Sequence, residues 1–252
     1  MIVVCLCHNE LRYTQGFVES VLKAKDDLKD VKIVMVDNGS TDGVTSGYLK
    51  TLSETNDNFV FIRNESNEWF TVACDRVIKK YPGEDIYLIN NDVVVLDGWL
   101  SGRALLKDYG MLGAVQLTPG NLRMSCFYGG ESDFMSHKQG WMWAVEGFDA
   151  VFPAEWLTFG ACMINRRLYD LVGGLDNELR FYCSDSDLSL RMRASGAKIG
   201  VVRDMRVIHY GGQTTKGMSE VFKRSVWEDS DQKRFAKKHK LKIMNYDYRE
   251  DK

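Results

Sequence analysis

Polar side chains that could bind a ligand or move a proton interrupt the apolar pattern of this sequence at five places. They are His8-Asn9-Glu10, Asp37-Asn38, Asn90-Asn91-Asp92, the pair Asp185 and Asp187, and His209. The first three follow short apolar runs that have the pattern of strands in a parallel sheet. Ligands of open α/β sheets bind outside the carboxyl ends of the strands. These three clusters are therefore expected to line one rim and to form a single binding site.

The segment Asn90-Asn91-Asp92 has, taken alone, the composition of a turn. Beside the other clusters, Asp92 becomes a candidate ligand for a cation, and His209 could add an imidazole, which Mn²⁺ accepts more readily than Mg²⁺. The sequence lacks the glycine patterns of dinucleotide-binding and P-loop proteins. Without a glycine-rich cradle, a nucleoside diphosphate would need a metal to offset its charge. A single carboxylate predicts that the metal arrives with the diphosphate.

Asp185 stands at the start of a predicted helix. A carboxylate is favoured there by the helix dipole, so position alone favours a helix cap. The functional alternative is a general base directed into the crevice. Asp187 would orient the helix start or an acceptor, and a structural cap is an equally good interpretation of it.

Alternating strand and helix patterns position these clusters. Apolar runs predict strands at 2–7, 31–36, 59–63 and 86–89, and amphipathic segments predict helices at 14–24, 46–54 and 69–81. The first of these helices is expected to direct Phe17, Val18, Val21 and Leu22 to one face. This alternation is typical of βαβ units, and it predicts the α/β class with a parallel sheet.

The second half of the chain is less regular. Further helices are predicted at 98–108, at 166–172 and from Asp185 through Arg193, and strands at 111–117, 158–165, 198–202 and 207–210. Residues 118–155 have no clear pattern, and their aromatic side chains could form a binding wall or cover the core: Trp141, Trp143, Phe148 and Phe152. The last forty residues are predicted to be helical and charged. Their basic run 233–242 is more typical of a solvated helix face than of a lipid or nucleic-acid contact.

The composition is that of an ordinary globular protein, with 252 residues, 44% hydrophobic and 27% charged residues, and a net charge of −2. Nucleic acid is disfavoured as a partner, although the basic run does not exclude it. The 6 cysteines form no Cys-x-x-Cys pair, which disfavours zinc and favours buried thiols. With no signal-peptide pattern and no apolar run long enough for a transmembrane helix, we expect a cytoplasmic location, with peripheral contact at a membrane surface left open.

Seven segments, in order, resemble motifs of the inverting nucleotide-sugar glycosyltransferases of family 2, and in particular their rhamnosyltransferase-like branch. They are Leu6–Glu10, Val36–Gly43, Leu88–Asp92, Gly98–Leu100, Gly160–Arg167, Val172–Asp176 with Ser184–Arg191, and Val207–Gly212. The resemblance implies the GT-A fold, a Rossmann-like, mostly parallel sheet flanked by helices. It also implies one catalytic domain over 1–215, with a nucleotide-sugar-binding half (1–92) and an acceptor-side half (93–215), followed by a charged helical extension (216–252).

The resemblance also implies roles for single residues. Asp185 would be the catalytic base, and Asp92 and His209 would hold Mn²⁺ or Mg²⁺. The nucleotide sugar, UDP-, dTDP- or GDP-linked, would lie against Leu6, His8, Glu10, Asp37, Asn67, Asp75 and Asn91, with Asp37 reading the base. The acceptor, a glycan, lipid-linked or other hydroxyl, would lie with the donor sugar near Gly160, Trp156 and Asp187.

The sequence departs from the family pattern at three positions. Ser184 replaces the usual Glu beside the base, Trp69 replaces Gly, and Asp75 replaces Asn. The Gln-x-x-Arg-Trp motif of processive synthases is absent, which disfavours a polymer synthase. Two alternatives are less well supported. A nucleotidyltransferase would need a basic glycine-rich loop after the first strand, and Cys7–Leu11 offers none. Against a non-catalytic carbohydrate-binding or scaffold protein with a retained transferase fold stands the retention of the proposed site residues Asp37, Asp92, Asp185 and His209.

Overall fold

The computed structural model describes residues 1–117, 119, 124–127, 139–142, 150–211 and 230–241. Its strands are β1 (Ile2–Cys7), β2 (Lys32–Asn38), β3 (Phe59–Asn64), β4 (Ile86–Asn90), β5 (Val93–Val95), β6 (Met111–Leu117), β7 (Met124–Phe127), β8 (Gln139–Met142), β9 (Val151–Pro153), β10 (Ala161–Ile164) and β11 (Ile199–His209). Its α-helices are α1 (Leu11–Lys23), α2 (Thr45–Thr55), α3 (Phe70–Lys80), α4 (Arg166–Leu171), α5 (Ser184–Ala194) and α8 (Gln232–His239).

All eleven strands belong to one sheet, whose main path runs β3-β2-β1-β4-β10-β6-β11-β5. The first four strands of this path are parallel, as the sequence predicts. β6 and β11 are parallel to each other, whereas β10 lies antiparallel between β4 and β6. The α/β class is confirmed, and β10 joins the two halves of the chain into one continuous sheet.

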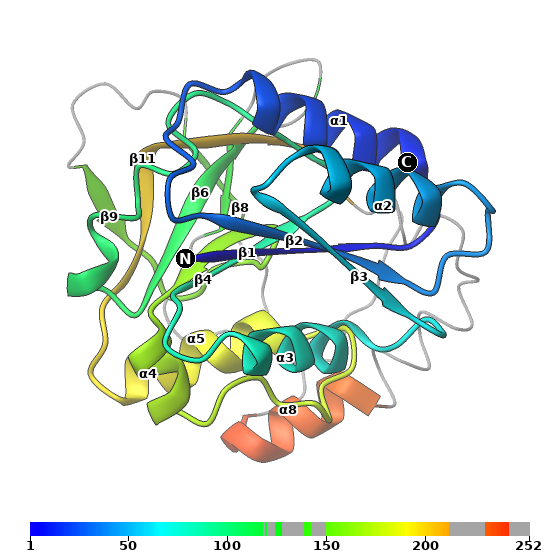
Figure 1. Ribbon diagram of the computed structural model, residues 1–252. Helices are drawn as coiled ribbons and strands as arrows, with labels where there is room; N and C mark the ends of the chain where they lie inside the picture. The colour runs from blue at the N-terminus through cyan, green and yellow to red at the C-terminus, as the bar shows by residue number, and fades with distance from the viewer. Residues whose placement is uncertain (118, 120–123, 128–138, 143–149, 212–229, 242–252) are drawn as a thin grey trace, which may run out of the picture.

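Helices cover both faces of the sheet (Figure 1). Successive side chains of a strand point to opposite faces, so β1 places Val3 and Cys5 in the core under α1 and α2, and Ile2 and Val4 in the core under α3, α4 and α5. The near-continuous apolar runs of the central strands are explained by this two-sided burial.

Two predicted helices differ from the structure: the first helix begins earlier than predicted, and the helix predicted at 98–108 does not form. α1 begins at Leu11 rather than at residue 14, and Leu22 is 52% exposed instead of packing with Phe17 and Val18. The predicted helix 98–108 is wrong, because this stretch forms turns and one 3₁₀ turn at Leu106–Asp108. Gly98 adopts φ +87°, outside the helical region, and its N–H donates to the Asp26 carboxylate at 2.8 Å.

The other second-half predictions are partly correct. The two strands predicted at 198–202 and 207–210 form the single strand β11, whose register shifts between Val202 and Arg206. In 118–155, Phe152 is buried in the core, Trp141 lies in β8, and Trp143 and Phe148 lie outside the described residues. Five cysteines are free and buried: Cys5, Cys7, Cys74, Cys162 and Cys183. Within the described part of the chain, no helix has the length and apolar character to cross a bilayer.

Candidate active site

The sheet brings the first three polar clusters together, as predicted. β1 lies between β2 and β4, and Leu6 is paired with both Val36 and Asn90. The strand ends at His8, Asp37 and Asn90 therefore lie on neighbouring strands at one rim. Leu6 itself is half-buried against the core under α3.

Asn9 and His8 tie the end of β1 to the loop after β2. The side-chain oxygen of Asn9 accepts the backbone N–H groups of Thr41 at 2.8 Å and Asp42 at 3.1 Å. His8 Nδ1 lies 3.0 Å from the carbonyl oxygen of Asn38. Asn9 and Glu10 are both left-handed, which is strained for residues other than glycine and lets α1 begin directly. Glu10 is exposed at the rim, and sequence reasoning gave Asn9 no role of its own.

Asp37 is completely buried at the end of β2. One carboxylate oxygen accepts the N–H of Ser40 at 2.8 Å, and the other pairs with the guanidinium of Arg63. Arg63, which sequence reasoning missed, offsets the cost of burying this charge. Base recognition by Asp37 stays a prediction, and it would involve Arg63, whose side chain is 44% exposed.

Asn67, in the loop after β3, is hydrogen-bonded to Asn38 at the end of β2. The Asn38 amide donates to Asn67 Oδ1 at 2.9 Å and accepts from Asn64 Nδ2 at 2.8 Å. The next residue after Asn38, Gly39, has φ +71°, and a Cβ there would lie 2.6 Å from the backbone nitrogen of Asn67. The loop after β2 thus packs backbone to backbone against the loop after β3.

Replacing Gly39 with Ala should destabilise the protein by about 3 kcal/mol. A left-handed alanine costs about 1–2 kcal/mol and overpacking adds about 1–3 kcal/mol. Gly43→Ala is the matched control, because Gly43 has φ +74° but a Cβ at that position would meet nothing within 4 Å. It should cost only the backbone term, about 1 kcal/mol. Urea unfolding of both variants tests this, and equal losses would contradict the close packing at Gly39.

Asp92 and His209 meet, although they come from distant parts of the chain. Asp92 is buried just after β4, and its Oδ1 lies 3.2 Å from Nε2 of His209 at the end of β11. Gln116, at the end of β6, places its Oε1 2.7 Å from His209 Nδ1. Asn90 Nδ2 lies 3.4 Å from the same Nε2. The predicted pair is therefore brought together, and Asn90 and Gln116 are partners that sequence reasoning missed.

This arrangement fits a divalent cation. The amide oxygen of Gln116 can only accept, so Nδ1 of His209 donates to it, and Nε2 is the ring nitrogen directed towards Asp92. A carboxylate oxygen and an imidazole nitrogen that lie 3.2 Å apart are both atom types that bind Mn²⁺. Adjacent ligands of an octahedral Mg²⁺ or Mn²⁺ lie about 3 Å apart. Among the described residues, no group of three or more His, Cys, Asp or Glu forms a metal cluster.

Gly160 permits this arrangement because it has no side chain. A Cβ there would lie 2.8 Å from Cε1 of His209 and 3.1 Å from Oε1 of Gln116. Gly160 is therefore placed against the histidine, whereas Trp156 is 4% exposed in the protein interior. Asn91, predicted to bind the donor, donates to Thr14 Oγ1 at 3.1 Å and so holds α1 to this turn.

Asp75, another predicted donor-binding residue, lies in a different polar group. Its carboxylate accepts from Tyr169 at 3.3 Å and Asn177 at 3.1 Å and pairs with Lys79 at 2.6 Å. None of these three partners is a candidate site residue. In this structure Asp75 joins α3 to α4 and to the loop that follows it.

Asp185 occupies the first turn of α5, and its Oδ1 accepts the N–H of Ser186 at 2.8 Å. The N-cap of α5 is Cys183 and the helix has no side-chain cap hydrogen bond, so Asp185 does not cap the helix but binds an N–H within its first turn. Asp185 lies in α5, which packs on the face of the sheet to which Cys162 of β10 points, and β10 is the strand that adjoins β4. Burial raises the pKa of the Cys162 thiol, and the charge of Asp185 raises it further.

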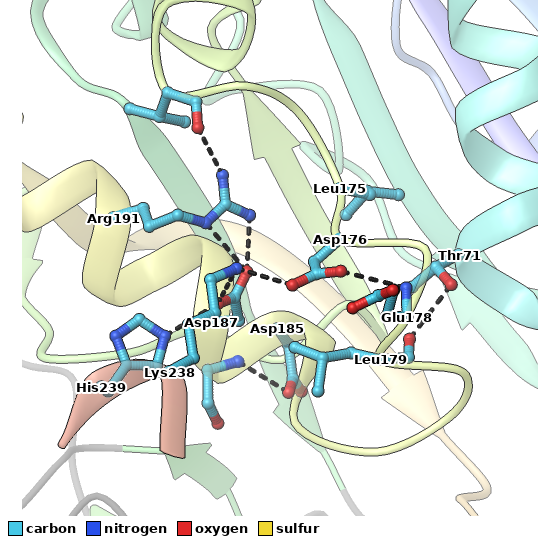
Figure 2. Close-up of polar contacts among 12 residues, drawn as sticks. Thr71, Leu175, Asp176, Glu178, Leu179, Asp185, Asp187, Arg191, Lys238 and His239 are labelled. Carbon is cyan, nitrogen blue, oxygen red and sulfur yellow. Dashed lines mark hydrogen bonds and ion pairs between the residues drawn. The ribbon is translucent and has the colours of Figure 1, made fainter. Parts of the chain in front are cut away.

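Asp187 is completely buried, and both of its carboxylate oxygens contact basic side chains (Figure 2). Its Oδ2 accepts from Nε and Nη2 of Arg191 at 2.9 and 2.6 Å. Its Oδ1 lies 2.7 Å from Lys238 Nζ and 2.8 Å from His239 Nε2. Asp187 therefore joins α5 to α8 through side-chain contacts, and it does not cap the start of α5. The basic run is more than a solvated face, because Lys238 and His239 contact this buried carboxylate.

Comparisons with known proteins identify the family of the chain. A family model described as "Glycosyl transferase family 2" matches residues 2–167. The O-antigen biosynthesis protein RfbC of Myxococcus xanthus is 28% identical over 146 residues, which cover 52% of this chain and 11% of RfbC. The chain thus spans a small part of that relative.

Solved structures share the fold at low sequence identity. GalNAc-T7 with UDP, GalNAc and Mn²⁺ matches 96% of this chain and 54% of its own, with TM-score 0.65 and 16% identity. A mannosyltransferase of Pyrobaculum calidifontis with GDP-Man and Mn²⁺ matches 96% of this chain and 64% of its own, with TM-score 0.66 and 14% identity. These likenesses confirm the predicted GT-A fold.

Proposed function

Since the chain belongs to glycosyl transferase family 2, we propose that it moves a sugar from a nucleoside diphosphate sugar to an acceptor hydroxyl with inversion. The observation that carries this proposal is the meeting of Asp92 and His209 at 3.2 Å on the rim of the sheet. The structures of similar fold that were solved with UDP or GDP-Man and Mn²⁺ support the donor class. The rhamnosyl branch remains one candidate for the donor sugar.

The donor would lie across the ends of β1, β2 and β4, in the half of the domain formed by residues 1–92. Asp37, with its partner Arg63, would contact the base, and His8 and Asn67 lie in the adjoining loops. Asp92 and His209 would hold Mn²⁺ or Mg²⁺, which supplies positive charge to the leaving diphosphate. Gln116 keeps the histidine ring oriented for this role.

Asp185 would act as the general base. It accepts the proton of the acceptor hydroxyl while the hydroxyl oxygen forms a bond to the anomeric carbon. The bond from that carbon to the diphosphate oxygen breaks on the opposite side, which inverts the configuration. Asp185 accepts the N–H of Ser186 in the first turn of α5, and a carboxylate positioned in this way can act as a general base.

The acceptor would lie in the half formed by residues 93–215, near α5 and Gly160. The name of the Myxococcus xanthus relative refers to O-antigen biosynthesis, which favours a growing glycan, free or lipid-linked. A cytoplasmic location belongs to the same proposal, because the five buried free thiols suit a reducing compartment.

A donor screen tests the proposal. With MnCl₂ present, a true donor at about ten times its Kd should raise the Tm by about 3–6 °C. UDP-GlcNAc, UDP-GalNAc, GDP-mannose and dTDP-rhamnose are suitable probes, with free nucleotides as controls. The donor that shifts the Tm should also release its nucleoside diphosphate slowly by transfer to water. A donor that binds but never releases it would favour the alternative, a non-catalytic carbohydrate-binding or scaffold protein.

A further inference from the structure

Residues 230–241 pack against the turn that leads into α5. Asp231 is completely buried, and its carboxylate accepts three consecutive backbone N–H groups. They are those of Arg180 at 3.1 Å, Phe181 at 2.8 Å and Tyr182 at 2.7 Å. A carboxylate held by several backbone donors is a strong, charge-assisted contact. Asp231 therefore fixes the backbone of this turn directly.

α8 continues the contact along α5. Phe235 is completely buried in a small core with Leu179 and Cys183. One turn further on, Lys238 and His239 bind Asp187 inside α5 (Figure 2). The contacts thus lie before and after Asp185 in the sequence.

Cys183 occupies a strained position between these two sets of contacts. It is the N-cap of α5 and is left-handed, with φ 60° and ψ 2°. Such a conformation is unfavourable for a residue with a Cβ, because the Cβ comes too close to the backbone. It persists only where the surroundings over-determine it, and here Asp231 holds the residues before it while Lys238 and His239 hold the helix after it.

We propose that α8 positions the general base, and that Asp231 is the positioning residue that keeps the turn at Cys183 in the conformation from which Asp185 reaches the acceptor. The inference rests on the proposed function, because it gives Asp185 its role. It assigns the C-terminal segment a part in turnover. A helix that only stabilised the fold would affect the Tm and leave kcat unchanged well below the Tm.

The test compares Asp231→Ala with Lys237→Ala, which changes an exposed residue of the same helix. The measured reaction is nucleoside diphosphate release with MnCl₂ from the donor that gives the largest Tm shift in the screen. Asp231→Ala should lower kcat by about 10- to 100-fold, with donor Kd changed less than about twofold, because misplacing a catalytic group has effects of this size. Hydrogen exchange of the Arg180, Phe181 and Tyr182 amides should become faster. Lys237→Ala should change none of these.

A second variant keeps the inference testable if Asp231→Ala folds poorly. Glycine adopts left-handed backbone at little cost, so adding Cys183→Gly to Asp231→Asn should recover part of the kcat lost in Asp231→Asn alone. Faster amide exchange at 180–182 with unchanged kcat, while Asp185→Asn is inactive, would overturn the inference and leave the proposed function standing. Wild-type turnover in Asp185→Asn would overturn both.

Discussion

Replacing Asp185 with Asn should lower kcat by about 10²–10⁴-fold and leave donor affinity nearly unchanged. The amide cannot take the proton of the attacking hydroxyl, but its oxygen can still accept the Ser186 N–H that Asp185 accepts at 2.8 Å. The start of α5 is therefore preserved, and the loss reports on chemistry. Steady-state release of nucleoside diphosphate gives kcat, and donor titration by calorimetry with MnCl₂ gives Kd.

Asp204→Asn is the matched control for this change. Asp204 is an exposed carboxylate on β11, paired with Arg203 and Arg206. Its loss should leave kcat within about twofold, since exposed ion pairs contribute about 1 kcal/mol or less and this one lies outside the proposed site. A variant Asp185→Asn that turns over at the wild-type rate would show that Asp185 has only a structural role in the first turn of α5.

Replacing Asp92 with Asn should remove most of the response to Mn²⁺. The change removes the one negative charge of the proposed ligand pair and leaves His209 as the main protein ligand. At an Mn²⁺ concentration that saturates the wild-type enzyme, kcat/KM of the variant should therefore fall by about 10²–10³-fold. The Mn²⁺ concentration for half-maximal activity should rise. Metal titrations of activity with the donor held constant measure both effects.

Stability separates this metal role from a structural one. Asp92 is 6% exposed, so its carboxylate is taken out of water, and its Oδ1 lies 3.2 Å from Nε2 of His209. In EDTA, Asp92→Asn should therefore unfold at the same Tm as wild type or higher. Asp97→Asn, which changes an exposed residue near β5, serves as control and should keep the wild-type Mn²⁺ response. A wild-type response in Asp92→Asn would contradict the metal site.

The parallel half of the sheet and its polar rim could be predicted because each signal is local. A strand buried on both faces is apolar along its length, as in Val3, Val4 and Cys5, and the first polar residue after it marks the carboxyl end. Strand alternation with helices then implies that neighbouring ends meet. The position of Asp37 at the rim, and that of Asp92, followed from this reasoning without any knowledge of their contacts.

The partners of these residues could not be predicted, because they depend on tertiary contacts. The available signal for Gln116 was a polar residue near the end of an otherwise apolar strand. Its burial, at 2% exposed, and its place beside His209 depend on the parallel pairing of β6 with β11. Arg63 reaches Asp37 because β3 is in register with β2. The antiparallel direction of β10 could not be predicted either, because its apolar residues indicate a buried strand but not the direction in which it pairs.

The helix predicted at 98–108 shows the opposite error, in which a local signal was overridden. Asp26 binds the backbone N–H groups of Gly98 and Leu100, at 2.8 and 3.0 Å, and fixes them in a turn. Likewise, the basic run at 233–242 could not reveal that Lys238 and His239 face a buried carboxylate, since charge alone does not indicate the direction of a side chain.

The separation of Asn90 and His209 by 119 residues has a consequence for how the protein folds. Contacts between distant parts of a chain require closure of a long loop, so they form late and slow the search for the native state. The helices and the first βαβ units can form from local contacts well before β11 docks beside β6. During refolding, circular dichroism should therefore recover before the capacity to bind Mn²⁺ with a nucleotide.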